Sequence, residues 1–326
     1  MSFDYLLDKI AKVRFETVPF RHIYINNFLD DAHFSQIVTS PEVALPIADS
    51  DEQIFKTMFE RNYKIIDFPG CITNKDAYIK WHKEKKHQTD RNNSACEGFG
   101  ITLRLIKPTS SIIAELFDFM LTDRFQDTLA AKFDINRNQV RYDAGIQKYL
   151  DGYEISPHAD VRAKALTYMI NINPGKDSEG RDHHTHYLRF RDEFKYIQAY
   201  WDGNPNVDRF WVPWGWCETV KMQRENNSLV IFKPDNTTLH GVRASYDHLA
   251  SQRTQMYGNL WYTDRKWAAM PNWEDFSFNP SKAKPKPAGA LGTFKAAVPP
   301  GLKQFVKKNI LGGDKDVLTM TSRFGK

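Results

Sequence analysis

Residues 149–160 read Tyr-Leu-Asp-Gly-Tyr-Glu-Ile-Ser-Pro-His-Ala-Asp, and this stretch indicates both the fold and the chemistry. Successive side chains of an extended segment point to opposite faces, so His158 and Asp160 present an imidazole and a carboxylate to the same side. Such a pair can chelate a metal ion, and His240, on a distant segment, would add a second imidazole. Two histidines and one carboxylate suit ferrous iron and leave other coordination positions open.

The sequence before His240 supports this interpretation. Residues 227–236 read Asn-Ser-Leu-Val-Ile-Phe-Lys-Pro-Asp-Asn, which is a short apolar run followed by turn residues. The pattern predicts a buried strand that ends in a turn. His240 would then begin the next strand, at the mouth of a sheet.

A basic residue follows His240 at a suitable place. Residues 253–262 read Arg-Thr-Gln-Met-Tyr-Gly-Asn-Leu-Trp-Tyr, an aromatic-rich run that is typical of a strand. An iron oxygenase that uses a dicarboxylic keto acid needs a cation in its pocket, and the planar fork of arginine binds a carboxylate in bidentate fashion. Arg253 is the favoured residue for this role, and Arg243 is its competitor.

With these residues the chain resembles the iron(II)- and 2-oxoglutarate-dependent dioxygenases, and within them the prolyl-4-hydroxylase-like branch. The resemblance is carried by residues 18–30, 149–160, 165–173, 240–242 and 253–262. It implies that His158, Asp160 and His240 bind Fe(II), with 2-oxoglutarate and O2 as co-substrates. It also implies that Arg253 binds the C5 carboxylate of 2-oxoglutarate.

The resemblance further implies a hydroxylation that releases succinate and CO2. Tyr149 and Asn171 match positions that line the co-substrate pocket in relatives. Halogenating relatives replace the ligand carboxylate by a small residue, whereas this chain retains Asp160, which favours hydroxylation. The primary substrate stays open, with a small molecule, a glycan and a peptide all compatible with the sequence.

Other classes of function also fit these residues. A cupin-type metal enzyme, such as a sugar isomerase, would share a jelly roll but typically has a denser set of His and Glu than the region of His158 offers. A hydrolase could use the same three residues for zinc. A non-catalytic carbohydrate-binding protein could use the tryptophans within residues 192–222.

The succession of patterns predicts an α+β fold that is mainly β with flanking helices and has a double-stranded β-helix, or jelly-roll, core. We expect N-terminal helices and outer strands in residues 1–138, the catalytic core in 139–265, and a C-terminal linker with a short helix in 266–326. Residues 111–132 carry apolar side chains at steps of three and four, which predict one long helix. Residues 192–222 form a tryptophan-rich insertion whose tryptophans we expect to serve as core.

A polar turn at residues 174–186 contains His183, His184 and His186. These histidines lack a carboxylate or cysteine at a fixed metal-binding spacing, so the sequence favours an exposed loop. The polar stretch 83–97 is predicted to be a loop or lid.

Composition limits the remaining choices. With 326 residues, 41% of them apolar and 13% aromatic, the chain can bury a sizeable core. Its 45 basic and 40 acidic residues are close to balance, so a nucleic-acid partner is not expected. Three cysteines, an odd number without metal-binding spacing, predict reduced thiols and a cytoplasmic protein. No apolar run reaches the length of a membrane span.

Overall fold

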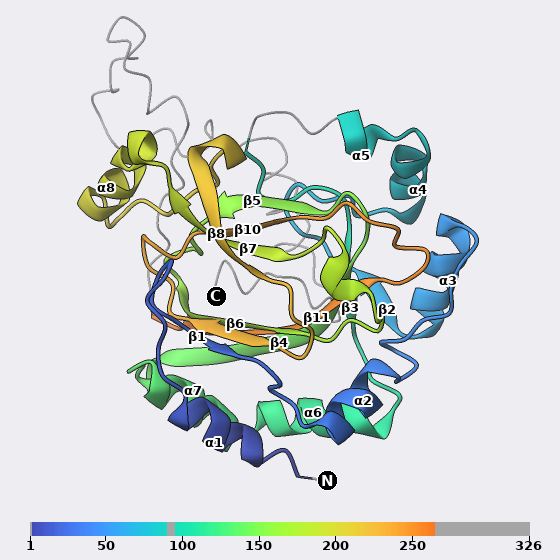
Figure 1. Ribbon diagram of the computed structural model, residues 1–326, viewed down its shortest axis with the longest axis horizontal. Coiled ribbons are helices and arrows are strands. Elements are labelled where there is room, and N and C mark those ends of the chain that lie inside the picture. The colour runs from blue at the N-terminus through green and yellow to red at the C-terminus, as the bar shows by residue number, and fades with distance from the viewer. Residues whose placement is uncertain (1, 90–94, 265–326) are drawn as a thin grey trace, which may run out of the picture. The chain divides into compact units, whose positions relative to one another are not determined.

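Two antiparallel sheets face each other in the computed structural model, which describes residues 2–89 and 95–264 (Figure 1). The larger sheet has the strand order β1 (His22–Ile25), β9 (Leu229–Phe232), β6 (Lys164–Asn171), β11 (Arg253–Tyr262), β4 (Val140–Tyr149), β3 (Thr102–Leu105) and β2 (Tyr63–Ile65). The smaller sheet has the order β5 (Glu154–His158), β10 (His240–Arg243), β7 (Thr185–Phe190) and β8 (Cys217–Gln223).

From β4 onward the chain passes from one sheet to the other at every strand except between β7 and β8, which are consecutive in the smaller sheet. Strands β4, β6, β9 and β11 lie in the larger sheet, and β5, β7, β8 and β10 lie in the smaller one. The three N-terminal strands extend the larger sheet at its two edges, with β1 beside β9 and with β3 and β2 beyond β4. The expectation of a mainly β architecture with flanking helices is therefore confirmed.

Helices cover the outer face of the larger sheet (Figure 1). The covering helices are α1 (Tyr5–Lys12), α2 (Asp31–Val38), α6 (Ser111–Leu121) and α7 (Asp123–Lys132). Their apolar stripes and the outward side chains of the sheet form one core, in which Ile10, Leu116, Ile146 and Leu260 are at most 1% exposed. Burying these stripes removes apolar surface from water and stabilises the layer.

Four further helices lie elsewhere in the described part of the chain. They are α3 (Asp51–Glu60), α4 (Lys75–Lys83), α5 (Lys86–Thr89) and α8 (Tyr196–Gly203). α3 contacts β2, and α4 contacts both α3 and α5. Short 3-10 turns span Arg137–Gln139, Ser178–Gly180, Asp192–Phe194 and Trp214–Trp216.

The single helix expected over residues 111–132 is wrong, because Thr122 divides it into α6 and α7. Thr122 has extended backbone angles, φ −66° and ψ 146°. Its hydroxyl donates to the carbonyl of Phe119 at 2.6 Å and accepts from the amide of Phe125 at 3.3 Å. The side chain thus closes one helix and caps the next, and apolar periodicity continues through the break.

The expected insertion over residues 192–222 contains α8, but it also contains most of β8, which the sequence did not reveal. β8 has only its first and last residues buried, so it lacks the alternation by which a strand is recognised. The expectation that the tryptophans serve as core is confirmed for Trp201 and Trp211, which are 0% and 8% exposed.

The expected exposure of the histidine-containing turn is wrong for His183 and His184, which are 1% and 3% exposed. The connection between β10 and β11 covers them: Ser245 donates its amide to the carbonyl of Asp182, and the ring of Tyr246 lies 4.8 Å from that of His183. Since this cover comes from a segment far along the chain, the local polar pattern did not indicate it.

Some expectations fall on residues outside the described ranges. The linker and short helix in 266–326 lie there, as do residues 90–94 of the stretch 83–97; the described part of that stretch includes α5. Within residues 2–89 and 95–264, no helix is long and apolar enough to cross a membrane. None of the three cysteines forms a disulfide.

Candidate metal centre

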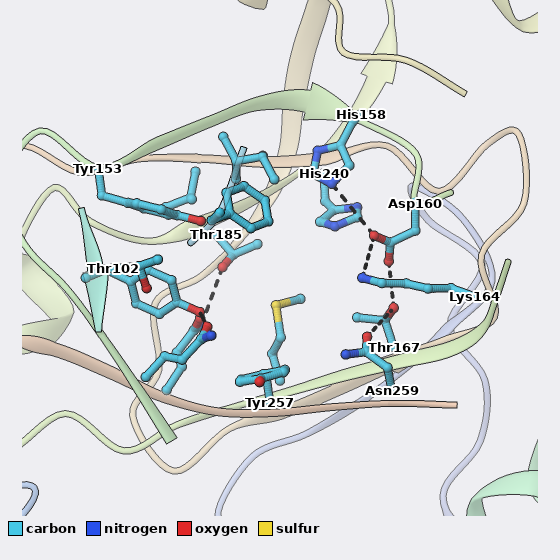
Figure 2. Close-up of a pocket in the computed structure, with 18 of the residues that line it drawn as sticks. Thr102, Tyr153, His158, Asp160, Lys164, Thr167, Thr185, His240, Tyr257 and Asn259 are labelled. Atoms are coloured by element: carbon cyan, nitrogen blue, oxygen red, sulfur yellow. Dashed lines mark hydrogen bonds and ion pairs between the residues drawn. The ribbon is translucent and has the colours of Figure 1, made fainter. Parts of the chain in front are cut away.

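The smaller sheet brings His158, Asp160 and His240 together at one end of a pocket (Figure 2). His158 ends β5, His240 begins β10, and these strands pair so that the two histidines are opposite each other in register. Their ring centroids lie 4.3 Å apart. One ligand atom from each of the three residues lies within 4.8 Å of the other two, and all three residues are buried.

Backbone carbonyls orient both imidazoles. Nδ1 of His158 lies 2.9 Å from the carbonyl of Ser156, and Nδ1 of His240 lies 3.0 Å from the carbonyl of Thr238. Because a carbonyl only accepts, each Nδ1 carries the proton and each Nε2 keeps a lone pair for a metal ion. Burial lowers the pKa of His240 to about 3, so this ring is neutral at neutral pH.

Asp160 is held in place by its neighbours on β6. Lys164 donates to Oδ1 at 2.8 Å, and the hydroxyl of Thr167 donates to Oδ2 at 2.6 Å. Burial favours the neutral acid, but Lys164 and the two histidines outweigh it and hold the pKa of Asp160 well below its ordinary value. Asp160 is therefore an ionised, oriented carboxylate that could bind a metal ion. Its backbone carbonyl also accepts from Arg209 at 2.6 Å.

The pocket lies between the two sheets and encloses about 930 Å³ of empty space, including its open mouth. The larger sheet contributes alternate residues of β11, which are Arg253, Gln255, Tyr257, Asn259 and Trp261. In Figure 2, His158, His240 and Asp160 lie at one end, and Tyr153, Thr102 and Thr185 lie toward the other.

Arg253 lines the same pocket. It is 3% exposed, and it donates from Nη2 to the hydroxyl of Thr185 at 3.0 Å. Its guanidinium carbon lies 4.5 Å from the centroid of the Tyr149 ring. Burial lowers the pKa of Arg253, although tyrosines surround it. Among the described residues no carboxylate forms an ion pair with Arg253, so the pocket holds a buried cation suited to an anionic occupant.

The competitor, Arg243, is engaged elsewhere. It binds Glu154 in bidentate fashion, with Nε to Oε2 at 2.8 Å and Nη2 to Oε1 at 2.9 Å. Arg243 is not among the residues that line the pocket. The structure thus distinguishes two arginines that sequence spacing left in competition.

Tyr149 and Asn171 have different positions relative to the pocket. Tyr149 lines it, stands opposite Arg253 in the β4–β11 register, and donates to Oε1 of Gln147 at 2.6 Å. Asn171 lies behind the wall: its Oδ1 accepts from Gln255 at 2.9 Å, and its Nδ2 donates to the carbonyls of Gln223 and Glu225. Asn171 therefore orients a residue that lines the pocket and does not itself line it.

Sequence reasoning did not single out Lys164, Thr167, Gln147 or Tyr257. Nε2 of Gln147 and Oη of Tyr257 are buried and have no hydrogen-bond partner among residues 2–89 and 95–264. Both line the pocket, and they are donors for an oxygen-rich occupant. The signal that could have revealed Tyr257 is the period of two along β11, counted from Arg253.

Comparison with solved structures gives several matches at low sequence identity. The chain is similar to a prolyl-4-hydroxylase from Pseudomonas putida, with 9% identity over 79% of this chain and 97% of that chain and a TM-score of 0.40. It is also similar to a Trichoplax adhaerens prolyl hydroxylase in complex with a hypoxia-inducible-factor peptide fragment, with 10% identity over 79% and 88% of the chains and a TM-score of 0.38.

A third match is an oxidoreductase of the 2OG-Fe(II) oxygenase family from Burkholderia pseudomallei, with 9% identity over 68% of this chain and 96% of that chain and a TM-score of 0.28. No protein-family model and no curated protein sequence matches the chain. Because the TM-scores and identities are low, the functional proposal depends on the side chains of the pocket.

Proposed function

We propose that this chain is a non-haem Fe(II)- and 2-oxoglutarate-dependent oxygenase that hydroxylates a substrate and releases succinate and CO2. One observation carries the proposal: a buried set of two histidines and one carboxylate shares a pocket with a buried arginine that has no carboxylate partner among the described residues. The division of β4–β11 into four strands in each of two facing antiparallel sheets supports a double-stranded β-helix as the framework.

In this proposal Nε2 of His158, Nε2 of His240 and Oδ1 of Asp160 hold the metal. Fe(II), with 2-oxoglutarate and O2 as co-substrates, would supply oxidative decarboxylation of the keto acid and the oxidising equivalent for hydroxylation. The chain supplies ligand geometry. The carbonyls that accept from each Nδ1 fix the imidazole tautomers, and Thr167 fixes the unligated oxygen of Asp160.

Arg253 and Thr185 would bind the distal carboxylate of 2-oxoglutarate. A planar guanidinium matches a carboxylate better than an ammonium does, and its burial strengthens the attraction because the surroundings are less polar than water. Gln147 and Tyr257 would donate their free hydrogens to the same co-substrate. Apolar wall residues, including Ile155, Val161, Met169 and Val242, would exclude water from the reacting centre.

The retained carboxylate favours hydroxylation, because Asp160 fills the position that halogenating enzymes leave open for chloride. The substrate class stays a small molecule, a glycan or a peptide. A peptide is bound by one of the similar proteins, the Trichoplax adhaerens prolyl hydroxylase.

The first test is an anaerobic titration of the protein with Fe(II) and 2-oxoglutarate. We expect the weak visible charge-transfer band of a keto acid chelated to iron in the wild-type protein and its loss in Asp160→Ala. Asp192→Ala, which removes an exposed carboxylate on another loop, is the matched control and should keep the band.

Each alternative predicts a different result. A zinc hydrolase or a cupin-type isomerase would bind metal through the same residues without the band and would act without O2 and keto acid. A carbohydrate-binding protein would retain its ligand after Asp160→Ala. Iron binding without the band in the wild-type protein would contradict the oxygenase proposal.

A further inference from the structure

A second group of metal-ligating side chains lies outside the pocket. It comprises Asp51 at the start of α3, His82 in α4, His87 in α5, Asp151 after β4 and His248 before β11. Among the described residues, ligand atoms of Asp51, His82 and His248 lie within 4.8 Å of one another, the same limit that the three residues of the pocket meet. None of the five residues lines the pocket.

Asp51 stands between two imidazole nitrogens. Its Oδ2 lies 2.9 Å from Nδ1 of His82, and its Oδ1 lies 2.9 Å from Nε2 of His248. The two rings are steeply inclined, at 62° with centroids 4.9 Å apart, so their nitrogen edges converge on the carboxylate and the rings do not stack. Donor atoms around a tetrahedral zinc ion lie about 3.3 Å apart, which is close to the spacing found here.

Asp151 lies beside these three residues and contacts two histidines of the group. Its Oδ2 lies 3.2 Å from Nε2 of His82 and 3.3 Å from Nε2 of His87. A ligand histidine usually donates its other ring N–H to a carboxylate, which fixes the tautomer and strengthens the ligand. Asp151 has this relation to His82 if Nδ1 of His82 faces the ion.

We propose that Asp51, His82 and His248 form a second, structural metal site of the zinc type, with Asp151 orienting His82. Mixed nitrogen and oxygen donors suit Zn²⁺, and water or the second oxygen of Asp51 can fill a fourth position. Iron chemistry of the proposed kind needs open positions next to a substrate pocket, and this group lies away from the pocket.

The proposed site is connected by hydrogen bonds to two residues that line the pocket, Tyr149 and Arg253. Oδ1 of Asp151 accepts from the backbone amide of Tyr246 at 3.0 Å. The hydroxyl of Tyr246 accepts from the backbone amide of Arg253 at 2.8 Å and donates to the carbonyl of Tyr149. An ion at Asp51, His82 and His248 would therefore tie α3 and α4 to the connection between β10 and β11, which has no sheet partner across most of its length.

The test uses Zn²⁺ alone and the double variant His158→Ala/His240→Ala, which lacks two of the proposed iron ligands. After treatment with a chelator and dialysis against Zn²⁺, we expect one tightly bound zinc per chain by elemental analysis, and a thermal midpoint that rises with zinc. Co²⁺ in place of zinc should give the visible spectrum of a tetrahedral site. The wild-type chain should take up two divalent ions.

In the double-variant background, Asp51→Asn and His248→Gln should each abolish stoichiometric zinc binding. Asp151→Asn should weaken binding by about 10- to 100-fold, as expected of a carboxylate that orients a ligand. His186→Gln, on β7 outside the cluster, is the matched control and should leave zinc bound.

A folded double variant without bound zinc would overturn the proposal and leave the cluster a hydrogen-bond network only. Zinc retained in both Asp51→Asn and His248→Gln would also overturn it. The first measurement leaves the cluster intact, so a cluster variant that fails to fold does not decide the matter. The zinc measurement involves neither iron nor keto acid. A negative result therefore contradicts the second metal site and leaves the proposed oxygenase function untouched.

Discussion

Arg253 combines burial, positive charge and the absence of a carboxylate partner among the described residues. Keeping a guanidinium out of water is costly unless an anion compensates it, so such a residue is retained where a ligand supplies that anion. Arg243 has the same side chain but faces Glu154, which already satisfies it. Arg253 and Arg243 therefore differ in their neighbours: among the described residues, Arg243 has a carboxylate partner and Arg253 has none.

We predict that Arg253→Gln raises the 2-oxoglutarate concentration needed for half-maximal turnover by about 30-fold or more. The reason is that removal of the buried cation that pairs with the carboxylate costs about 2 kcal/mol or more of binding free energy. Arg253→Lys should fall between Gln and the wild type, because an ammonium lacks the bidentate fork. Steady-state assays of succinate release measure both.

Arg243→Gln is the matched control for this prediction. It should leave the 2-oxoglutarate requirement unchanged, because Glu154 and Trp214 are the neighbours of Arg243 and none of the three lines the pocket. An unaltered requirement in Arg253→Gln, or a large rise in Arg243→Gln, would transfer the role to another residue.

Among the elements, the break between α6 and α7 shows how one side chain decides a boundary. The apolar residues on both sides of Thr122 keep the same spacing, so the pattern alone favours one helix. The hydroxyl of Thr122 offers the backbone an alternative to the helical hydrogen bonds, so α6 ends there and α7 begins at the next residue.

We predict that Thr122→Ala lowers the free energy of unfolding by about 1 kcal/mol, because the amide of Phe125 loses its cap. Denaturation by urea, with the wild type measured in parallel, checks the value. Thr128→Ala, at a half-buried position of α7, is the control; it should be neutral or slightly stabilising, since alanine is the better helix former. Equal losses in both variants would mean that capping is not the cause.

For the whole molecule, stability in acid depends on carboxylates that the fold holds ionised. Glu42 is fully buried by surface area, and its carboxylate accepts from the amides and hydroxyls of Thr109 and Ser110 just before α6. Burial favours the neutral acid, but these four hydrogen bonds prevail and lower the pKa of Glu42 to about 2. The folded state therefore prefers the ionised form more strongly than the unfolded chain does.

The sign of the pH dependence follows from this shift. The stabilisation by Glu42 is complete above the ordinary glutamate pKa, 4.5, and is lost as pH falls from there toward about 2. We predict that Glu42→Gln is less stable than the wild type near neutral pH and that the difference in unfolding free energy shrinks as pH decreases below 4.5.

Urea denaturation across that pH range measures the difference directly. Glu60→Gln, at an exposed position of α3, is the control and should show only a small difference in unfolding free energy from the wild type. A gap between wild type and Glu42→Gln that stayed constant with pH would show that the carboxylate is not held ionised by the fold.

The sequence by itself determined those features that depend on short-range spacing. The period of two placed His158 and Asp160 on one face, the turn before His240 placed that residue at a strand start, and the aromatic run after Arg253 predicted β11. Most strands and the mainly β architecture followed in the same way, because one face of each strand must be buried.

Only the tertiary structure decided which distant side chains meet. The choice between Arg253 and Arg243, the position of Asn171 behind Gln255 and the burial of His183 depend on segments that pack from elsewhere in the chain. The cluster around Asp51 joins residues from three helices and two loops that no local period connects. Such contacts are set by how the sheets and helices pack together, and a pattern read along the chain has no access to that geometry.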